Sequence, residues 1–287
     1  MNLLIVTGIF PPDVGGPATY VPRIANVLND RGWNVEVITA GHTEADLEFP
    51  YPVHRVPRSA PGRYRESVPT IIDRAGWADR LYVNGLEMDN YLAGFFHSCP
   101  RIQKCVGDRS WERYRNSGRG ELDIDEFQEC NPDFRTWLER SIHRHVTRGS
   151  DEFIVPSHYL KSILAKWGIP TEDITVIYNH SHPPQSIPDE PISWPGSDLK
   201  MLSVGRLVPW KRVPQLIKRL PNLPRAGLVV LGDGPERSRC RKTINRASVA
   251  GRVELKGNVD RPVVWQHLRE ADLLVLNSTY EGFPHIL

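Results

Sequence analysis

Short apolar runs that alternate with stretches of helical spacing constrain this sequence more than any other feature. Leu3–Thr7 is such a run and ends at Gly8, and Val21–Leu28 then carries apolar residues at helical spacing. Similar runs follow at Val35–Thr39, Leu81–Asn84, Ile102–Val106, Phe153–Val155 and Thr175–Tyr178. Buried strands that alternate with helices form parallel sheets covered on both faces. The pattern therefore predicts an α/β fold.

One segment interrupts this rhythm. Ser186–Asp198, SIPDEPISWPGSD, has prolines and a glycine without periodicity, which is typical of a linker. Strand-like runs then return at Met201–Val204, Leu228–Leu231, Val253–Leu255 and Leu273–Leu276, with helical stretches near Val213–Leu220 and Val263–Arg269. We therefore predict two Rossmann-like, doubly wound parallel-sheet domains, at 1–185 and 199–287, joined by a linker at 186–198. Ligands of such sheets bind beyond the carboxyl ends of the strands.

The charge of the chain is unevenly distributed. The net charge is only +2, so we expect no nucleic-acid partner. From Gly196 onward, however, 16 Lys and Arg residues face 8 Asp and Glu residues. This excess suits an anionic ligand such as a diphosphate, and an ordinary solvated basic surface would explain it equally well.

The cysteines and the N-terminus suggest a cytoplasmic location. The four cysteines form no C-x-x-C pair, which argues against a metal knuckle or a redox motif. The first apolar run is too short for a signal peptide, and no stretch approaches the roughly 20 apolar residues that span a bilayer. We expect a cytoplasmic protein without a metal.

Glycines at two places could bring the backbone close to a phosphate. Gly15 and Gly16 lie between the first strand and the first helix, where backbone N–H groups and the helix dipole favour an anion. Gly232 and Gly234 flank Asp233 directly after another strand. A plain tight turn remains the alternative at both places.

Charged residues follow two of the later strands. Arg206 comes directly after Met201–Val204 and Gly205, and Lys211 lies five residues further on. Fixed cations at that position would stabilise a departing diphosphate, whereas two solvated cations are the simpler alternative. Glu281, followed by Gly282 and Phe283, could accept hydrogen bonds from sugar hydroxyls, or it could be an ordinary exposed loop acid.

Together, these pieces resemble one family. The resemblance covers essentially the whole chain and rests on the order of short motifs: the Gly-Gly loop, GRLVPWK (205–211), LGDGP (231–235), Gly257-Asn258-Val259 and STYEGFP (278–284), preceded by KCVGDRSWER (104–113), DIDEFQ (123–128), VPSHYLKSILAKWGI (155–169) and VIYN (176–179). In this order they resemble the retaining glycosyltransferase family 4, which has the GT-B fold.

The resemblance implies roles for individual residues. Arg206 and Lys211 match the cations that hold the diphosphate of a UDP- or GDP-sugar, and Glu281 matches the first Glu of the E-x7-E motif near the transferred sugar. Gly16 matches the loop that meets the donor phosphates, and Asp108 falls near a residue that faces the reacting sugar. The expected donor-binding set is Gly15, Gly16, Arg206, Lys211, Gly232, Gly234, Glu281, Gly282 and Phe283. The resemblance implies a glycan or lipid-linked acceptor and no cofactor.

The sequence departs from the family pattern at its end. The second Glu of E-x7-E would fall at position 289, and the chain ends at Leu287. We therefore expect a fragment with an incomplete donor domain. A non-catalytic remnant, a subunit completed by a partner, and a nucleotide-sugar epimerase of the same fold remain alternatives.

Basic residues beside aromatic and apolar residues suggest a peripheral membrane contact on the inner face of the membrane. Two groups share this character: Arg101, Lys104, Arg109, Arg113, Arg115 and Arg119, and Trp137-Leu138 with Arg135, Arg140, Arg144 and Arg148. Such groups bind anionic lipids, and a solvated helix face is the alternative.

Overall fold

The computed structural model describes residues 1–13, 15–41, 47–130, 133–181, 183–196, 198–284 and 286. It divides into two compact units. Unit 1 contains residues 1–110 and 131–178, and unit 2 contains residues 111–130 and 179–287. These units differ from the predicted domains at 1–185 and 199–287, because residues 111–130 pack with unit 2.

Unit 1 is built on a seven-stranded sheet with the strand order β3-β2-β1-β4-β5-β6-β7, and every strand pair is parallel. The strands are β1 (Asn2–Thr7), β2 (Asn34–Ala40), β3 (Val53–Val56), β4 (Arg80–Asn84), β5 (Arg101–Lys104), β6 (Glu152–Val155) and β7 (Ile174–Val176). The predicted strands are confirmed with shifted ends. Strand β3 was not predicted, because the polar residues His54 and Arg55 interrupt its apolar pattern.

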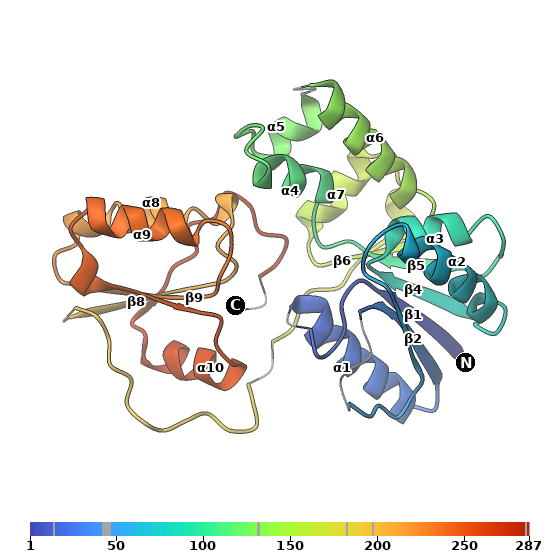
Figure 1. Cartoon of the computed structure of the whole chain (residues 1–287), viewed down its shortest axis with the longest axis horizontal. Helices are drawn as coiled ribbons and strands as arrows, with labels where there is room; N and C mark the ends of the chain where they lie inside the picture. The colour runs from blue at the N-terminus through green and yellow to red at the C-terminus, as the bar shows by residue number, and fades with distance from the viewer. Residues whose placement is uncertain are drawn as a thin grey trace. The chain divides into compact units, whose positions relative to one another are not determined.

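Helices cover both faces of this sheet. Val21 and Ala25 of α1 (Gly16–Asp30) pack on Leu3 and Ile5, and α2 (Gly62–Ala75) packs on the opposite face, against Leu4 and Val6 (Figure 1). The other helices that begin in this unit are α3 (Glu87–Ala93), α4 (Arg109–Asn116), α6 (Phe134–Thr147) and α7 (His158–Lys166). Ser157 is the N-cap residue of α7, and its Oγ accepts a hydrogen bond of 3.2 Å from Leu160 N.

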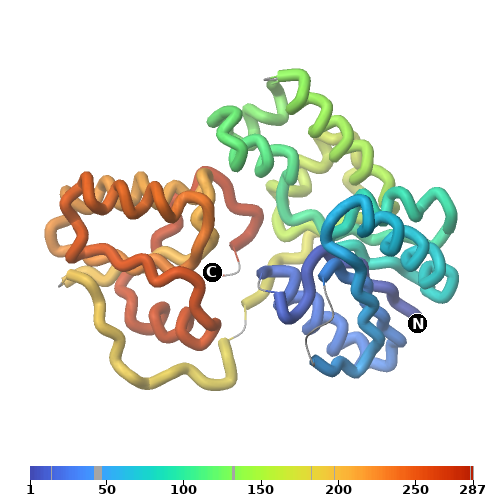
Figure 2. Tube along the Cα trace, viewed as in Figure 1, coloured from blue at the N-terminus to red at the C-terminus, as the bar shows by residue number. Residues whose placement is uncertain are grey.

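Unit 2 has a four-stranded parallel sheet with the order β10-β9-β8-β11. Its strands are β8 (Leu199–Val204), β9 (Ala226–Leu231), β10 (Val253–Gly257) and β11 (Leu273–Leu274). Its helices include α5 (Ile124–Glu129), α8 (Val213–Ile217), α9 (Arg237–Arg246) and α10 (Arg261–Glu270). Helices α8 and α9 cover one face of the sheet and α10 the other (Figures 1 and 2). Successive β9 residues alternate between these two layers, as a strand buried on both sides requires.

The segment predicted as a linker is packed against unit 2. The Trp194 ring donates a hydrogen bond of 3.2 Å to Gly227 O, and Gln266 of α10 donates one of 2.6 Å to Glu190 O. Arg269 also contacts Asp189, 3.1 Å away. Asp189, Glu190 and Trp194 of this proline-rich stretch therefore lie against β9 and α10.

The cysteines and the helix lengths bear on the remaining predictions. All four cysteines are free thiols, and Cys105 and Cys240 are buried. Within the part of the chain that the structure describes, no helix combines the length and the apolar character needed to cross a bilayer.

Candidate functional site

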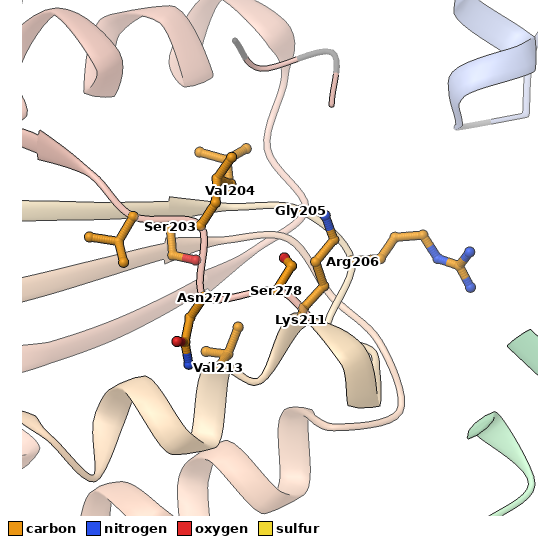
Figure 3. A pocket seen from close by; sticks show the side chains of 10 residues that line it. Ser203, Val204, Gly205, Arg206, Lys211, Val213, Asn277 and Ser278 are labelled. Carbon is orange, nitrogen blue, oxygen red and sulfur yellow. The ribbon is translucent and has the colours of Figure 1, made fainter. Parts of the chain in front are cut away.

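A pocket lies at the carboxyl edge of the sheet in unit 2, where residues that follow β8 and β11 meet (Figure 3). The two strands are parallel neighbours, so the loops after them emerge at the same edge. The lining residues are Ser203, Val204, Gly205, Arg206, Lys211, Val213, Val275, Leu276, Asn277 and Ser278. The predicted residues Arg206 and Lys211 are therefore brought to one place by the fold.

Lys211 forms an ion pair across this pocket. Its Nζ donates to Oε1 of Glu281, and Ser278 Oγ donates a second hydrogen bond, of 2.5 Å, to the same oxygen. The Lys211 and Glu281 side chains are only 19% and 24% exposed. A partly buried charge pair with an additional donor holds both side chains in a defined position. The structure thus joins two residues that the sequence analysis assigned separately to the diphosphate and to the sugar.

Arg206 behaves differently from Lys211. Its side chain is exposed and extends away from the pocket, whereas Lys211 runs along the pocket toward Gly205 (Figure 3). Among the described residues, the Arg206 guanidinium has no hydrogen bond or ion pair. The two cations therefore border one pocket without converging, and their shared role in holding a diphosphate stays a prediction.

Glycines allow the loops around the pocket to pack closely. A Cβ atom at Gly232 would collide with the carbonyl oxygen of Gly205, and one at Gly234 would collide with the backbone of Leu207. The backbones are joined by hydrogen bonds of 2.9 Å from Gly205 N to Leu231 O and from Leu207 N to Asp233 O. Gly232 and Gly234 thus shape the loop that carries Arg206. The expected contact of Gly232 and Gly234 with the donor stays a prediction.

A buried tryptophan supports both charged loops. The Trp111 ring is fully buried in unit 2, with its centroid 5.1 Å from that of Trp210 and 5.3 Å from that of Tyr280. Trp210 directly precedes Lys211, and Tyr280 directly precedes Glu281. Neither periodicity nor the motifs single out Trp111 for this role, because the contact joins residues about 100 and 170 positions apart.

The pocket is compact in this conformation. Its volume is about 10 Å³, roughly the space of one water molecule. Asn277 and Ser278 line it, although the sequence analysis did not assign them. Their position directly after the predicted strand Leu273–Leu276 is a signal that could have identified them. Asn277 Nδ2 donates a hydrogen bond of 3.0 Å to Arg212 O, which joins the β11 loop to the segment carrying Lys211.

The remaining residues of this loop contribute backbone contacts. Gly282 and Phe283 follow Glu281 and are partly buried. Phe283 O accepts a hydrogen bond of 2.8 Å from Asn179 Nδ2. This contact fixes the position of the loop. The predicted contact of Gly282 and Phe283 with the donor stays a prediction.

The glycine loop of unit 1 begins α1. Gly15 is the N-cap residue, and its carbonyl oxygen accepts a hydrogen bond of 3.1 Å from Thr19 N. Gly16 has open space where a side chain would lie. The preceding residue, Val14, lies outside the described residues. The predicted contact between this loop and a phosphate stays a prediction.

Asp108 lies deep in unit 1. Its side chain has no solvent exposure, and its Oδ1 accepts hydrogen bonds from Ser110 N, at 2.9 Å, and from Ser110 Oγ. His143 Nδ1 lies 3.5 Å from the same oxygen, and the Asp108 charge raises the pKa of Arg144 against the larger lowering effect of burial. Its carboxylate therefore holds the start of α4 and balances a cation of α6. In this conformation it is closed to a ligand.

The basic group predicted between Arg101 and Arg119 is only partly exposed, and its membrane contact stays a prediction. Lys104 is only 8% exposed, and its ammonium lies 3.5 Å from the centroid of the Tyr20 ring. The Arg101 side chain is mostly covered, and Arg109 pairs with Glu87. Burial lowers the pKa of Lys104 to about 8. The sequence shows the charges, whereas the burial depends on the assembled sheet.

His, Cys, Asp and Glu side chains are the groups that could bind a metal ion in this chain. Over the described ranges, no three of them come together in an arrangement that could hold a metal ion. The geometry of the pocket is that of cations and hydroxyls at a sheet edge, a combination that suits an anionic ligand.

Two family models match the chain. Residues 15–180, more than half of the sequence, match the glycosyl transferase 4-like domain, and residues 188–287 match the glycosyl transferases group 1. The chain belongs to the group 1, family 4 glycosyltransferases. An uncharacterised glycosyltransferase of Methanocaldococcus jannaschii is 21% identical over 98% of this glycosyltransferase and 76% of the relative. The lipopolysaccharide 1,6-galactosyltransferase of Salmonella typhimurium is 30% identical over 52% of the chain and 43% of the relative.

Solved structures confirm the GT-B fold of this glycosyltransferase. HepE of Anabaena in complex with UDP and glucose matches all of the chain and 77% of its own length, with a TM-score of 0.69 and 19% identity. The lipopolysaccharide outer core galactosyltransferase WaaB, in its apo form, matches 99% of the chain and 76% of its own length, with a TM-score of 0.63 and 18% identity. The predicted fold and the predicted transferase class are thus both confirmed.

Proposed function

We propose that this glycosyltransferase moves a sugar, with retention of configuration, from a UDP-sugar to a hydroxyl group of a glycan or lipid-linked acceptor on the cytoplasmic side of the membrane. The observation that carries the proposal is the pocket after β8, where Lys211 is held by Glu281 and Arg206 stands at the border. We propose UDP rather than GDP as the nucleotide of the donor because the related HepE structures contain UDP or UDP-glucose. The name of the Salmonella relative supports galactose as a first donor sugar to test.

The proposed reaction breaks one bond and forms another. The bond between the anomeric carbon and the β-phosphate oxygen breaks, and its electron pair leaves with UDP. The acceptor oxygen bonds to the anomeric carbon on the same face, and its proton passes to the departing phosphate. Lys211 would stabilise the charge that develops on the diphosphate, and no metal is required for this step. Glu281 would then accept hydrogen bonds from sugar hydroxyls.

The ion pair between Lys211 and Glu281 also suggests how the donor diphosphate enters the pocket. The Lys211 ammonium is neutralised by Glu281 in this conformation, so a diphosphate must either share it or displace Glu281. The Glu281–Ser278 hydrogen bond would keep the carboxylate beside the sugar after such an exchange. A prepositioned cation costs little reorganisation at the moment of reaction.

Replacement of Lys211 by alanine tests the proposal. Because a charge-assisted hydrogen bond contributes about 1.5–3 kcal/mol, we expect Lys211→Ala to weaken UDP binding about 10- to 100-fold in calorimetry. Transfer from UDP-galactose to a sugar acceptor should fall at least as much. Lys218→Ala, which removes an exposed lysine at the end of α8, is the matched control and should bind UDP like the wild type.

Two results would count against the assignment. Equal UDP affinity for Lys211→Ala and the wild type would remove Lys211 from the donor site. No binding of UDP or GDP to the wild-type chain would favour the alternative of a non-catalytic remnant or of a subunit completed by a partner.

A further inference from the structure

Helix α6 buries polar residues and exposes apolar ones, which is the reverse of an ordinary surface helix. The residues it buries are Thr136, Arg140, Val146 and Thr147, three of which are polar. Large apolar side chains on its other side face solvent, and their exposed fractions are 75% for Phe134, 43% for Trp137, 42% for Leu138 and 44% for Ile142. A surface helix normally buries its apolar stripe and exposes its polar one.

The exposed apolar residues lie together. Phe134, Trp137, Leu138 and Ile142 have the spacing of neighbours along one helix face. The rings of Phe134 and Trp137 are stacked, with centroids 5.6 Å apart. We call this row of four residues the α6 apolar face.

A hollow extends the α6 apolar face onto the neighbouring helix α3 within unit 1. It has a volume of about 450 Å³ and lies between Met88 and Tyr91 on one side and Ile142 and His145 on the other. The Tyr91 ring meets the Phe95 ring edge-on, with centroids 5.2 Å apart. Phe95 is itself 68% exposed, so a continuous apolar surface runs from α6 across α3.

Arginines border this apolar surface. Arg148 lines the hollow and is exposed, and its Nε donates a hydrogen bond of 3.3 Å to Arg144 O. The Arg135 side chain is 76% exposed at the other end of the helix, where it pairs with Glu139. The surface therefore combines aromatic and aliphatic side chains with cations at its border.

We infer that the α6 apolar face docks onto a bilayer that contains anionic phospholipids. An in-plane helix immerses its apolar side chains at the boundary between headgroups and acyl chains, and tryptophan favours this depth. Arg135 and Arg148 stand where anionic headgroups would meet them. A symmetric contact with a second copy fits less well, because it would bring the same arginines of both copies to one interface.

Flotation with vesicles tests this inference on the full chain. We expect wild-type protein to float with vesicles of phosphatidylcholine and phosphatidylglycerol, and to remain mostly unbound with phosphatidylcholine alone. The double variant Phe134→Ser/Ile142→Ser should reduce the bound fraction at least fivefold. The matched control, Val27→Ser/Leu223→Ser, removes apolar residues that are 48% and 40% exposed elsewhere and should bind like the wild type.

The cationic border is tested separately. Arg135→Gln/Arg148→Gln should reduce binding to the anionic vesicles and make the remainder insensitive to salt. Arg23→Gln/Arg31→Gln, with two exposed arginines of α1 and its C-cap, is the control and should retain binding. Circular dichroism and UDP binding confirm that each variant is folded, because none of these residues lies in the pocket of unit 2.

Several outcomes would overturn the inference. These are no flotation of the wild type with anionic vesicles, equal flotation with both lipid compositions, or an equal loss in the variants and their controls. A wild-type dimer in sedimentation that Phe134→Ser/Ile142→Ser converts to a monomer, without vesicle binding, would instead assign the α6 apolar face to a second copy. UDP binding is measured independently, so failure here leaves the proposed transfer reaction untouched.

Discussion

Charged residues lie at the carboxyl ends of β5 in unit 1 and of β8 in unit 2, and they differ in their exposure to solvent. Strand β5 ends at Lys104, Asp108 follows four residues later, and both residues are buried. After β8 come Arg206, which is exposed, and Lys211, which forms a partly exposed pair in a pocket. The position at a sheet edge is the same in both units. The covering of that edge therefore decides whether a charge supports the fold or can meet a ligand.

Removal of the Asp108 carboxylate should break the comparison most strongly. Its loss leaves the mostly buried ring of His143 and the partly buried charge of Arg144 without the Asp108 carboxylate. Asp108→Ala should therefore lower the free energy of unfolding by about 3–5 kcal/mol. Urea denaturation measures this change. Asp73→Ala, on the exposed side of α2, is the control and should cost less than about 1 kcal/mol. If Asp108→Ala kept its stability and lost transfer activity, Asp108 would belong to the reaction as first predicted.

Lys104 allows a test with pH. Its pKa is about 8 in the folded chain and 10.5 ordinarily, so between these values the unfolded chain binds more protons and stability gains with rising pH. Lys104→Met removes this dependence and should stabilise the protein by about 1–3 kcal/mol at pH 7, because burial of the ammonium is partly offset by Tyr20. The advantage should fade as the pH approaches 10.5.

The difference between variant and wild type is the quantity to measure, by urea denaturation from pH 7 to 10.5. Burial raises the pKa of Cys105 and of Tyr82, and these groups lower stability over part of the same range in both proteins. A difference that stays constant with pH would show that Lys104 is not the titrating group.

Arg206 gives the smallest expected effect and sharpens the comparison within unit 2. Because its side chain is exposed, Arg206→Gln should weaken UDP binding by less than about fivefold, and the effect should shrink as salt is added. Arg219→Gln, an exposed arginine after α8, serves as the control in the same titration. A loss as large as that of Lys211→Ala would mean that Arg206 turns into the pocket when UDP binds.

Much of the fold could be predicted from the sequence, because each buried parallel strand corresponds to a short apolar run. The runs at Leu3–Thr7 and Leu228–Leu231 predicted β1 and β9 almost to the residue, whereas β3, with His54 and Arg55, escaped detection. Such a polar edge strand is fixed by its pairing with β2 and not by its own residues.

The candidate site was predictable only as far as strand ends allow. Placement after β8 and β11 brought Arg206, Lys211 and Glu281 to one edge, as expected from parallel topology. The pairing of Lys211 with Glu281 and the burial of Asp108 depend on how distant segments pack. No local pattern records such contacts, and the polar buried face of α6 escaped for the same reason.

The glycine contacts between the turns after β8 and β9 have a mechanical consequence. Gly205 and Leu207 are bonded to Leu231 and Asp233, and Gly232 leaves no gap in which one turn could slide past the other. Any ligand that shifts the Arg206 loop must drag the neighbouring turn along with it. Occupancy of the pocket would thus be transmitted to the start of α9, in residues that never touch the ligand.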